Sequence, residues 1–260
     1  MRICSGRYTV RLIAALGFAY LLSESCTQNV SAATFTPEMS RLLEQAEKLE
    51  RAATGCREQV QSGQMSDCRV EVNFQNDRLV SPATADALAV ELRIQAHRLS
   101  HSEIQQQNGE NNRSAYNYAE IINRFEVATN PLYAPSNAAT YCNFFVQDVT
   151  RAMGAPLPQL LVNDTWNWLN DRTKGGAQGW RRLTPNEAQR TANSGHPTVA
   201  IWNNPGGGHG HVAIVRPGSI GDPRGDAEAQ AGKRTLNATH ITRGFNNQDM
   251  DKSIIYWGHN

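Results

Sequence analysis

Hydrophobic positions recur at helical spacing through the first part of the chain. A helix is predicted to start at the Thr36-Pro37 pair and to break at Gly55, because apolar residues follow every three or four positions: Met39, Leu42, Leu43, Ala46 and Leu49. A second helix is predicted from Ser81-Pro82, with one apolar face made by Leu88, Leu92, Ala96 and Leu99. A short strand over 70–74, a polar loop over 105–112 and a helix over 115–127 complete a mostly helical first part.

The pattern changes in the second part, where helices come first and strands follow. Helices are predicted over 141–153, closed by Gly154, over 164–169, and from the Thr184–Glu187 capping box to about Ala192. Short apolar or alternating runs then predict strands over 198–202, 211–215, 227–232, 238–245 and 253–259. This order predicts an α+β domain in which helices pack on an antiparallel sheet.

The N-terminus has the three parts of a secretory signal. Arg2, Arg7 and Arg11 precede an apolar run over 12–22, and small residues over 31–33 suit signal peptidase. We therefore expect residues 1–33 to be removed and the mature chain to be periplasmic or extracellular, without stable membrane insertion. A retained membrane anchor is the alternative, and lipidation at Cys26 is disfavoured by the nearby Glu24.

Composition and charge narrow the classes of partner. Hydrophobic residues make up 40% of the chain and charged residues 19%, which is typical of a folded domain. The formal net charge is +1 and no long basic run occurs, so we expect no nucleic-acid partner.

Cysteine usage leaves one thiol over. Cys4 and Cys26 would leave with the signal, and an oxidising compartment favours a disulfide between Cys56 and Cys68. Cys142 is then unpaired, and such a thiol in an exported protein is either buried and inert or reactive.

The position of Cys142 favours a reactive thiol. Asn137 or Thr140 is expected to cap the helix and to place Cys142 in its first turn. Free N–H groups and the helix dipole there favour an anion, which lowers the pKa of a thiol and produces a nucleophile.

The stretch NNPGGGHGHVAIV offers a base for this thiol. His211 opens an apolar strand that is entered through glycines, which allow close approach of a backbone. Gln230 lies between small residues on the next strand and could orient the imidazole. A polar residue on an edge strand, without a catalytic role, is an equally good interpretation of Gln230.

Four segments carry a resemblance to a known family: TYCNFFVQDVTRAMG, NDTWNWL, GHPTVAIWNNPGGGHGHVAIVRPG and AEAQAG. Over about residues 115–260 the chain resembles the NlpC-like and CHAP-type cysteine peptidases and amidases of the papain-like superfamily. The resemblance implies a papain-like domain over 113–260, after a helical region over 34–112. By the same match Cys142 is the nucleophile, His211 the base and Gln230 the orienting residue, a position where the family more often has histidine, asparagine or glutamate.

The resemblance implies hydrolysis of peptide or amide bonds in peptidoglycan, without cofactor or metal. The stem or cross-linking peptides would be the substrate, and the residues expected near the cleft are Tyr141, Asn143, Trp168, Trp202 and His209. Core packing is an alternative role for both tryptophans. The helical region over 34–112 could gate the site, bind a partner, or simply cap the domain.

Other readings of the same residues remain open. His209, His211 and Cys142 could ligate zinc, but no H-E-x-x-H or paired-cysteine motif accompanies them. A phosphate loop is weaker, because PGGGHG lacks the Gly-Lys-Ser/Thr ending. A non-catalytic module of the same fold could bind wall fragments. An antibacterial amidase toxin would use the same chemistry and would have an immunity or inhibitor protein as partner.

Overall fold

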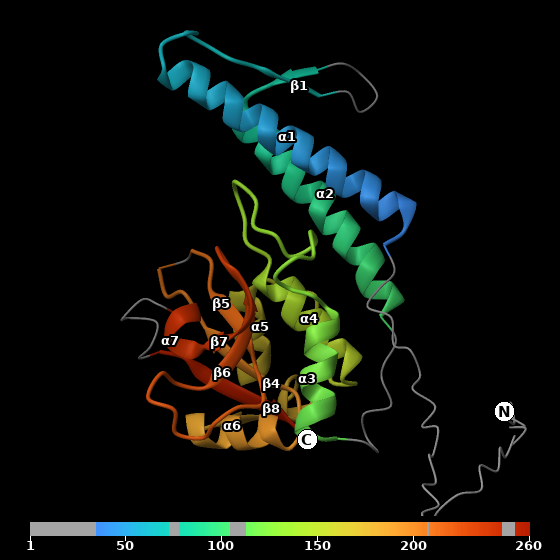
Figure 1. Ribbon diagram of the computed structural model, residues 1–260, viewed down its shortest axis with the longest axis vertical. Coiled ribbons are helices and arrows are strands. Elements are labelled where there is room, and N and C mark those ends of the chain that lie inside the picture. Colours follow the sequence, from blue (N-terminus) through green and yellow to red (C-terminus); the bar gives the residue numbers. More distant parts are fainter. Residues whose placement is uncertain (1–34, 73–77, 105–112, 207, 246–252) are drawn as a thin grey trace, which may run out of the picture. The chain divides into compact units, whose positions relative to one another are not determined.

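The computed structural model describes residues 35–72, 78–104, 113–206, 208–245 and 253–260 (Figure 1). All of these residues belong to one compact unit. The expected signal over 1–33, Cys26 and the expected loop over 105–112 lie outside the described residues. Among the helices of the described chain, none has the length and hydropathy needed to cross a bilayer.

Two long antiparallel helices form a hairpin at the N-terminal side of the described chain (Figure 1). They are α1 (Pro37–Gln61) and α2 (Pro82–Glu103), and a two-stranded ribbon of β1 (Val70–Val72) and β2 (Arg78–Val80) lies between them in sequence. Thr36 and Ser81 accept hydrogen bonds at the two helix N-termini, as the sequence predicted. The Cys56–Cys68 disulfide, also predicted, joins α1 to the segment before β1.

One expectation for this hairpin is wrong. Helix α1 continues through Gly55 to Gln61, because burial of Ala53 and Cys56 offsets the cost of about 1 kcal/mol for a helical glycine. The apolar residues predicted on one face of α2 pack toward the core, with Ala96 enclosed and Leu88, Leu92 and Leu99 partly buried. The enclosed positions of α2 also include polar and further small residues: Ala85, Asp86, Ala89, Arg93, His97, Ser100 and His101.

A six-stranded antiparallel sheet forms the second part of the unit. Its order is β3 (Trp180–Leu183), β8 (Ile255–His259), β4 (Thr198–Trp202), β5 (His211–Val215), β6 (Ala227–Ala231) and β7 (Thr235–His240). The helices of this part are α3 (Ala115–Arg124), α4 (Cys142–Ala152), α5 (Val162–Asn170), α6 (Pro185–Asn193) and the short α7 (Ile241–Gly244). The predicted α+β class with an antiparallel sheet is therefore confirmed.

The packing of the sheet places the candidate residues. All side chains of β4 and β5 are buried, so both faces at the centre of the sheet are covered. Helix α4 contacts β5 and β6, while α6 contacts β4 and β8. The N-terminus of α4 thus lies beside the strands that carry His211 and Gln230.

Two strand predictions needed correction. Strand β3 was missed, because it is a short edge strand whose two central side chains are exposed arginines. The strand expected over 238–245 ends at His240, and α7 follows it. Burial of Ile241 and Phe245 together with a hydrogen bond from the Phe245 N–H to the Ile241 carbonyl favours a helical turn there.

Candidate active site

Cys142 is the first residue of α4, but the helix is capped differently from the prediction. The N-cap residue is Tyr141, and its side chain accepts no hydrogen bond from the first turn. Asn137 is not the cap, because its amide donates to the carbonyl of Glu50 and to side-chain oxygens of Thr54 and Asp86. The uncapped N-terminus leaves N–H groups for the sulfur, and the Asn143 N–H donates to it.

Three side chains from separate elements interact in sequence. The imidazole of His211, the first residue of β5, interacts with the Cys142 thiol and lowers its pKa. Nε2 of His211 lies 2.5 Å from Oε1 of Gln230 on β6, which leaves Nδ1 for the thiol. The structure therefore brings together the three residues that the sequence singled out as nucleophile, base and orienting group.

The surroundings of this chain favour a thiolate beside an imidazolium. Burial raises the pKa of Cys142, but hydrogen bonds from His211 and from the N–H groups of Val212 and Asn143 outweigh burial, so the pKa falls below that of an ordinary thiol. Burial lowers the pKa of His211, but the bonds to Cys142 and Gln230 outweigh it and raise the pKa above its ordinary value. Both shifts extend the pH range in which the charged pair exists.

Gln230 of β6 and Phe245, which directly follows α7, enclose the imidazole of His211. The ring of Phe245 packs edge-on against His211, with centroids 4.7 Å apart. Gln230 follows a bulge in the β6–β7 pairing, and its side chain is buried. The His211–Gln230 hydrogen bond is therefore shielded from water, which strengthens it and limits rotation of the ring.

Glu228 is a buried carboxyl group that the sequence reading missed. It lies two residues before Gln230, and the two side-chain ends approach the same Gly244. Its carboxyl oxygens have no hydrogen-bond partner within the described chain, and burial raises its pKa well above the ordinary range. Burial therefore disfavours the charged form of Glu228, and with it a second negative charge next to the Cys142–His211 pair.

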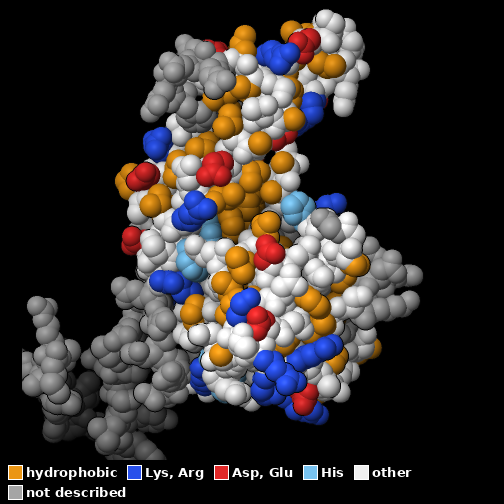
Figure 2. Space-filling view, turned by 180° about the vertical axis from the view of Figure 1, so that it is seen from behind, with side chains coloured by type: hydrophobic (Ala, Val, Ile, Leu, Met, Phe, Trp, Pro, Cys, Tyr) orange, Lys and Arg blue, Asp and Glu red, His pale blue; other side chains and the backbone are white. Residues whose placement is uncertain are grey.

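A cavity of about 410 Å³ opens onto Cys142. Three of the residues expected at the cleft line it: Tyr141, Asn143 and His209. Trp202 belongs to the main core cluster and Trp168 packs against it. Both tryptophans therefore lie in or against the core, as the alternative role predicted. A further part of the wall comes from α2, through Val90 and Ile94. Figure 2 shows hydrophobic side chains gathered where the helical hairpin meets the rest of the described chain.

The described residues of the loop between β4 and β5 are held by hydrogen bonds to α5. Asn163 of α5 donates to the carbonyl of Gly208 and accepts from the N–H of Asn204. A β-carbon at Gly210 would lie 2.5 Å from the carbonyl oxygen of Trp202 and 2.6 Å from Oδ1 of Asn163. Gly210 is therefore required by close packing within the protein, which is a different use from clearance for a substrate backbone.

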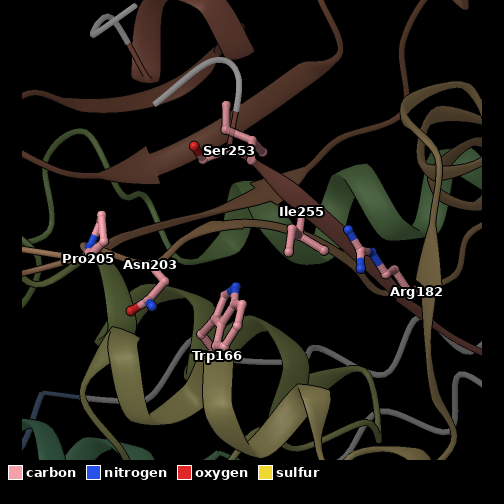
Figure 3. Close-up of a pocket in the computed structure, with 7 residues that line it drawn as sticks. Trp166, Arg182, Asn203, Pro205, Ser253 and Ile255 are labelled. Atoms are coloured by element: carbon pink, nitrogen blue, oxygen red, sulfur yellow. The ribbon is translucent and has the colours of Figure 1, made fainter. Parts of the chain in front are cut away.

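A second hollow lies on the other side of this loop. It measures about 380 Å³, and its lining includes Trp166, Arg182, Asn203, Pro205 and Ile255. Figure 3 shows the indole of Trp166 beside Ile255, with Arg182 and Asn203 on opposite sides of it. Trp166 is thus the tryptophan of α5 that lines a surface hollow, whereas Trp168 was predicted to lie at the cleft.

A second cluster of titratable side chains, which the sequence reading missed, joins α2 to α4. Oδ1 of Asp148 lies 3.1 Å from Nε2 of His97 and 2.6 Å from Nδ1 of His101. The hydroxyl of Tyr133 donates to Oδ2 of Asp148 over 2.7 Å. The available sequence signal was the spacing of His97 and His101, one helical turn apart on a single helix.

Comparison with known proteins yields no assignment. No family model matches the chain, and a search of curated proteins finds no match either. The function has to be inferred from the residues and their geometry.

Proposed function

We propose that the protein is a papain-like cysteine hydrolase of the NlpC or CHAP type that cleaves peptide or amide bonds in peptidoglycan. The observation that carries the proposal is the row of Cys142, His211 and Gln230 at the edge of a cavity, in which His211 lowers the pKa of the thiol and is itself hydrogen-bonded to Gln230. A nucleophile bonded to a base, which is bonded in turn to an orienting group, is the arrangement that acyl transfer requires.

The reaction begins with the thiolate of Cys142 attacking the carbonyl carbon of the scissile bond. The N–H of Cys142, at the N-terminus of α4, stabilises the oxyanion. The His211 imidazolium gives its proton to the leaving amine as the C–N bond breaks, and a thioester remains on Cys142. His211 then takes a proton from water, the hydroxide attacks the thioester, and the C–S bond breaks to regenerate the Cys142 thiolate beside the His211 imidazolium. The product leaves as a carboxylic acid and loses its proton to solvent.

Gln230 holds the base in position during both steps. Its Oε1 accepts from Nε2–H of His211, so Nδ1 stays directed at the sulfur. A neutral amide orients the ring without adding charge, and the raised pKa of Glu228 disfavours a negative charge beside the ion pair.

The proposed substrate and compartment rest on two supports. The segments around Cys142, His211 and Gln230 resemble those of wall hydrolases, and the N-terminal pattern is typical of export. The cavity walls supplied by the β4–β5 loop and by α2 would hold an extended peptide across the thiol.

Digestion of purified peptidoglycan tests the proposal. Wild type should release fragments whose masses identify the cleaved bond, and Cys142→Ala and Cys142→Ser should release none. Equal release by wild type and Cys142→Ala would refute the nucleophile assignment. Binding to peptidoglycan without cleavage by any variant would instead identify the protein as a binding module.

A further inference from the structure

The cluster of His97, His101 and Asp148 is separate from the residues assigned to catalysis. The imidazoles come from successive turns of α2, and the carboxylate comes from α4, 47 and 51 residues away in sequence. One nitrogen of each imidazole and one carboxylate oxygen lie within 4.8 Å of one another. The exposed fractions of the three side chains are 3%, 9% and 0%. Donors of metal-binding type thus converge at one enclosed point.

The donor set and its spacing suit a small divalent transition metal. Two imidazoles and a carboxylate are a typical protein ligand set for Zn²⁺. Ligand atoms in a tetrahedral zinc site lie roughly 3.3 Å apart, given metal–ligand distances of about 2 Å. The Asp148 oxygen lies 3.1 Å from the nitrogen of His97 and 2.6 Å from that of His101, and all three donor atoms lie within 4.8 Å of one another, so small side-chain movements would let them meet at one ion.

The groups around the cluster hold the ligands as an outer shell would. Tyr133 donates to Oδ2 of Asp148, the oxygen that the histidines do not contact, and so fixes the plane of the carboxylate. The ring of His97 stacks on Phe144, with centroids 3.8 Å apart and planes within 2°. Outer hydrogen bonds and ring packing of this kind orient first-shell ligands and raise metal affinity.

The charge of the site also favours a cation. The nearby Arg93 is committed to a bidentate pair with Glu50, and Arg151 donates to the carbonyl of Ile104. Within the described chain, Asp148 forms one ion pair with His97 and one with His101. A divalent ion would neutralise this buried carboxylate and use the imidazole lone pairs at the same time.

We propose that His97, His101 and Asp148 form a binding site for a divalent transition metal, with Zn²⁺ the best fit, that fastens α2 to α4. The metal would link α2 to α4, because its ligands come from both helices and are distinct from the residues assigned to the reaction. It nevertheless bears on the cleft, since α2 also supplies Val90 and Ile94 to the cavity wall. The proposal does not depend on the proposed hydrolase activity.

Zinc titration of the full chain tests this site in a Cys142→Ala background, which removes the free thiol as a competing ligand. After EDTA treatment and dialysis, calorimetry with ZnCl₂ should show one ion bound per chain. His97→Gln and His101→Gln should each weaken binding by at least about 100-fold, and Tyr133→Phe by about tenfold, in line with the loss of an outer-shell bond. His240→Gln, a histidine outside the cluster, is the matched control and should bind zinc as the parent does.

Cobalt binding supplies a readout that needs no ligand variant. Co²⁺ added to the EDTA-treated Cys142→Ala chain should give the intense visible absorption of a tetrahedral ion, and Zn²⁺ should displace it. Absence of binding to the folded parent would overturn the proposal and leave a purely hydrogen-bonded cluster. Equal zinc affinity in His97→Gln, His101→Gln and the parent would overturn it too, even if Asp148 variants failed to fold.

Discussion

Helix α4 carries two clusters of titratable side chains that use histidine in different ways. At its first residue, Cys142 pairs with one histidine and borders a cavity. Six residues further along, Asp148 contacts two histidines and a tyrosine and has no exposed surface. In both clusters burial raises the pKa of the acidic group. The histidines more than reverse this effect at Asp148, and at Cys142 the histidine does so together with the backbone N–H groups of Val212 and Asn143.

The comparison shows what separates a reactive anion from a structural one. Both oxygens of Asp148 are occupied by donors, so this carboxylate holds α2, α4 and the segment of Tyr133 together. The sulfur of Cys142 is also hydrogen-bonded, but it lines a cavity that a substrate carbonyl can enter. Stabilisation of the anion is common to both clusters, and access to it distinguishes them.

The largest expected effect concerns the histidine of the first cluster. His211→Ala should reduce hydrolysis by about 10³-fold, because the proton transfers at both steps lose their acid and base. His240→Ala is the matched control and should keep the wild-type rate. The measurement is the initial rate of fragment release from purified peptidoglycan.

Alkylation across pH checks the same prediction without a substrate. In wild type the lowered pKa of Cys142 should bring the iodoacetamide reaction to its plateau below the pH that an ordinary thiol needs. In His211→Ala the raising effect of burial remains and the bond from His211 is gone, so the profile should move to higher pH. Superimposable profiles would contradict an ion pair between the two residues.

Removal of the Asp148 carboxylate from the second cluster should lower the stability of the protein. Asp148→Ala leaves three buried donors without their shared acceptor, and should lower the free energy of unfolding by about 3 kcal/mol. Urea unfolding of EDTA-treated protein measures this loss. Asp148→Asn, which keeps an acceptor, should recover part of it. If Asp148→Ala unfolded at the wild-type urea concentration, the cluster would have no structural role.

The contrast between the two clusters also explains what could be read from the sequence. Helix starts at Thr36, Ser81 and Thr184 were predictable because capping depends on neighbours a few residues away. Cys142 and His211 could be singled out because a helix start and a glycine-led strand start are both local signals. Their pairing was expected from the resemblance of their segments to a known family.

The cluster of His97, His101 and Asp148 could not be predicted from the sequence, because which face of α2 is buried depends on tertiary packing. Helix α2 packs on both α1 and α4, so its buried face follows those partners and encloses Arg93, His97 and His101 in preference to its leucines. The end of β7 at His240 likewise depends on burial of Ile241 and Phe245. Side-chain periodicity within one element does not reveal such partners.

A smaller effect is expected at the orienting residue of the first cluster. Gln230→Ala should lower kcat by about tenfold, since a neutral hydrogen bond contributes about 1.4 kcal/mol and His211 would lose its fixed orientation. Gln230→Asn keeps the amide on a shorter side chain and should show a smaller loss. Steady-state kinetics on a soluble stem peptide measures both. A loss as large as that of His211→Ala would mean that Gln230 does more than orient the ring.

The smallest effect is expected where the two regions meet at the cavity. Ile94 of α2 lines the same cavity as Cys142. Ile94→Ala removes apolar contact worth about 1 kcal/mol, so KM should rise about fivefold while kcat stays the same. Leu99→Ala, on α2 but outside the cavity lining, is the control and should leave KM unaltered. An equal fall in kcat for Ile94→Ala would show that the hairpin acts on the transition state as well as on substrate binding.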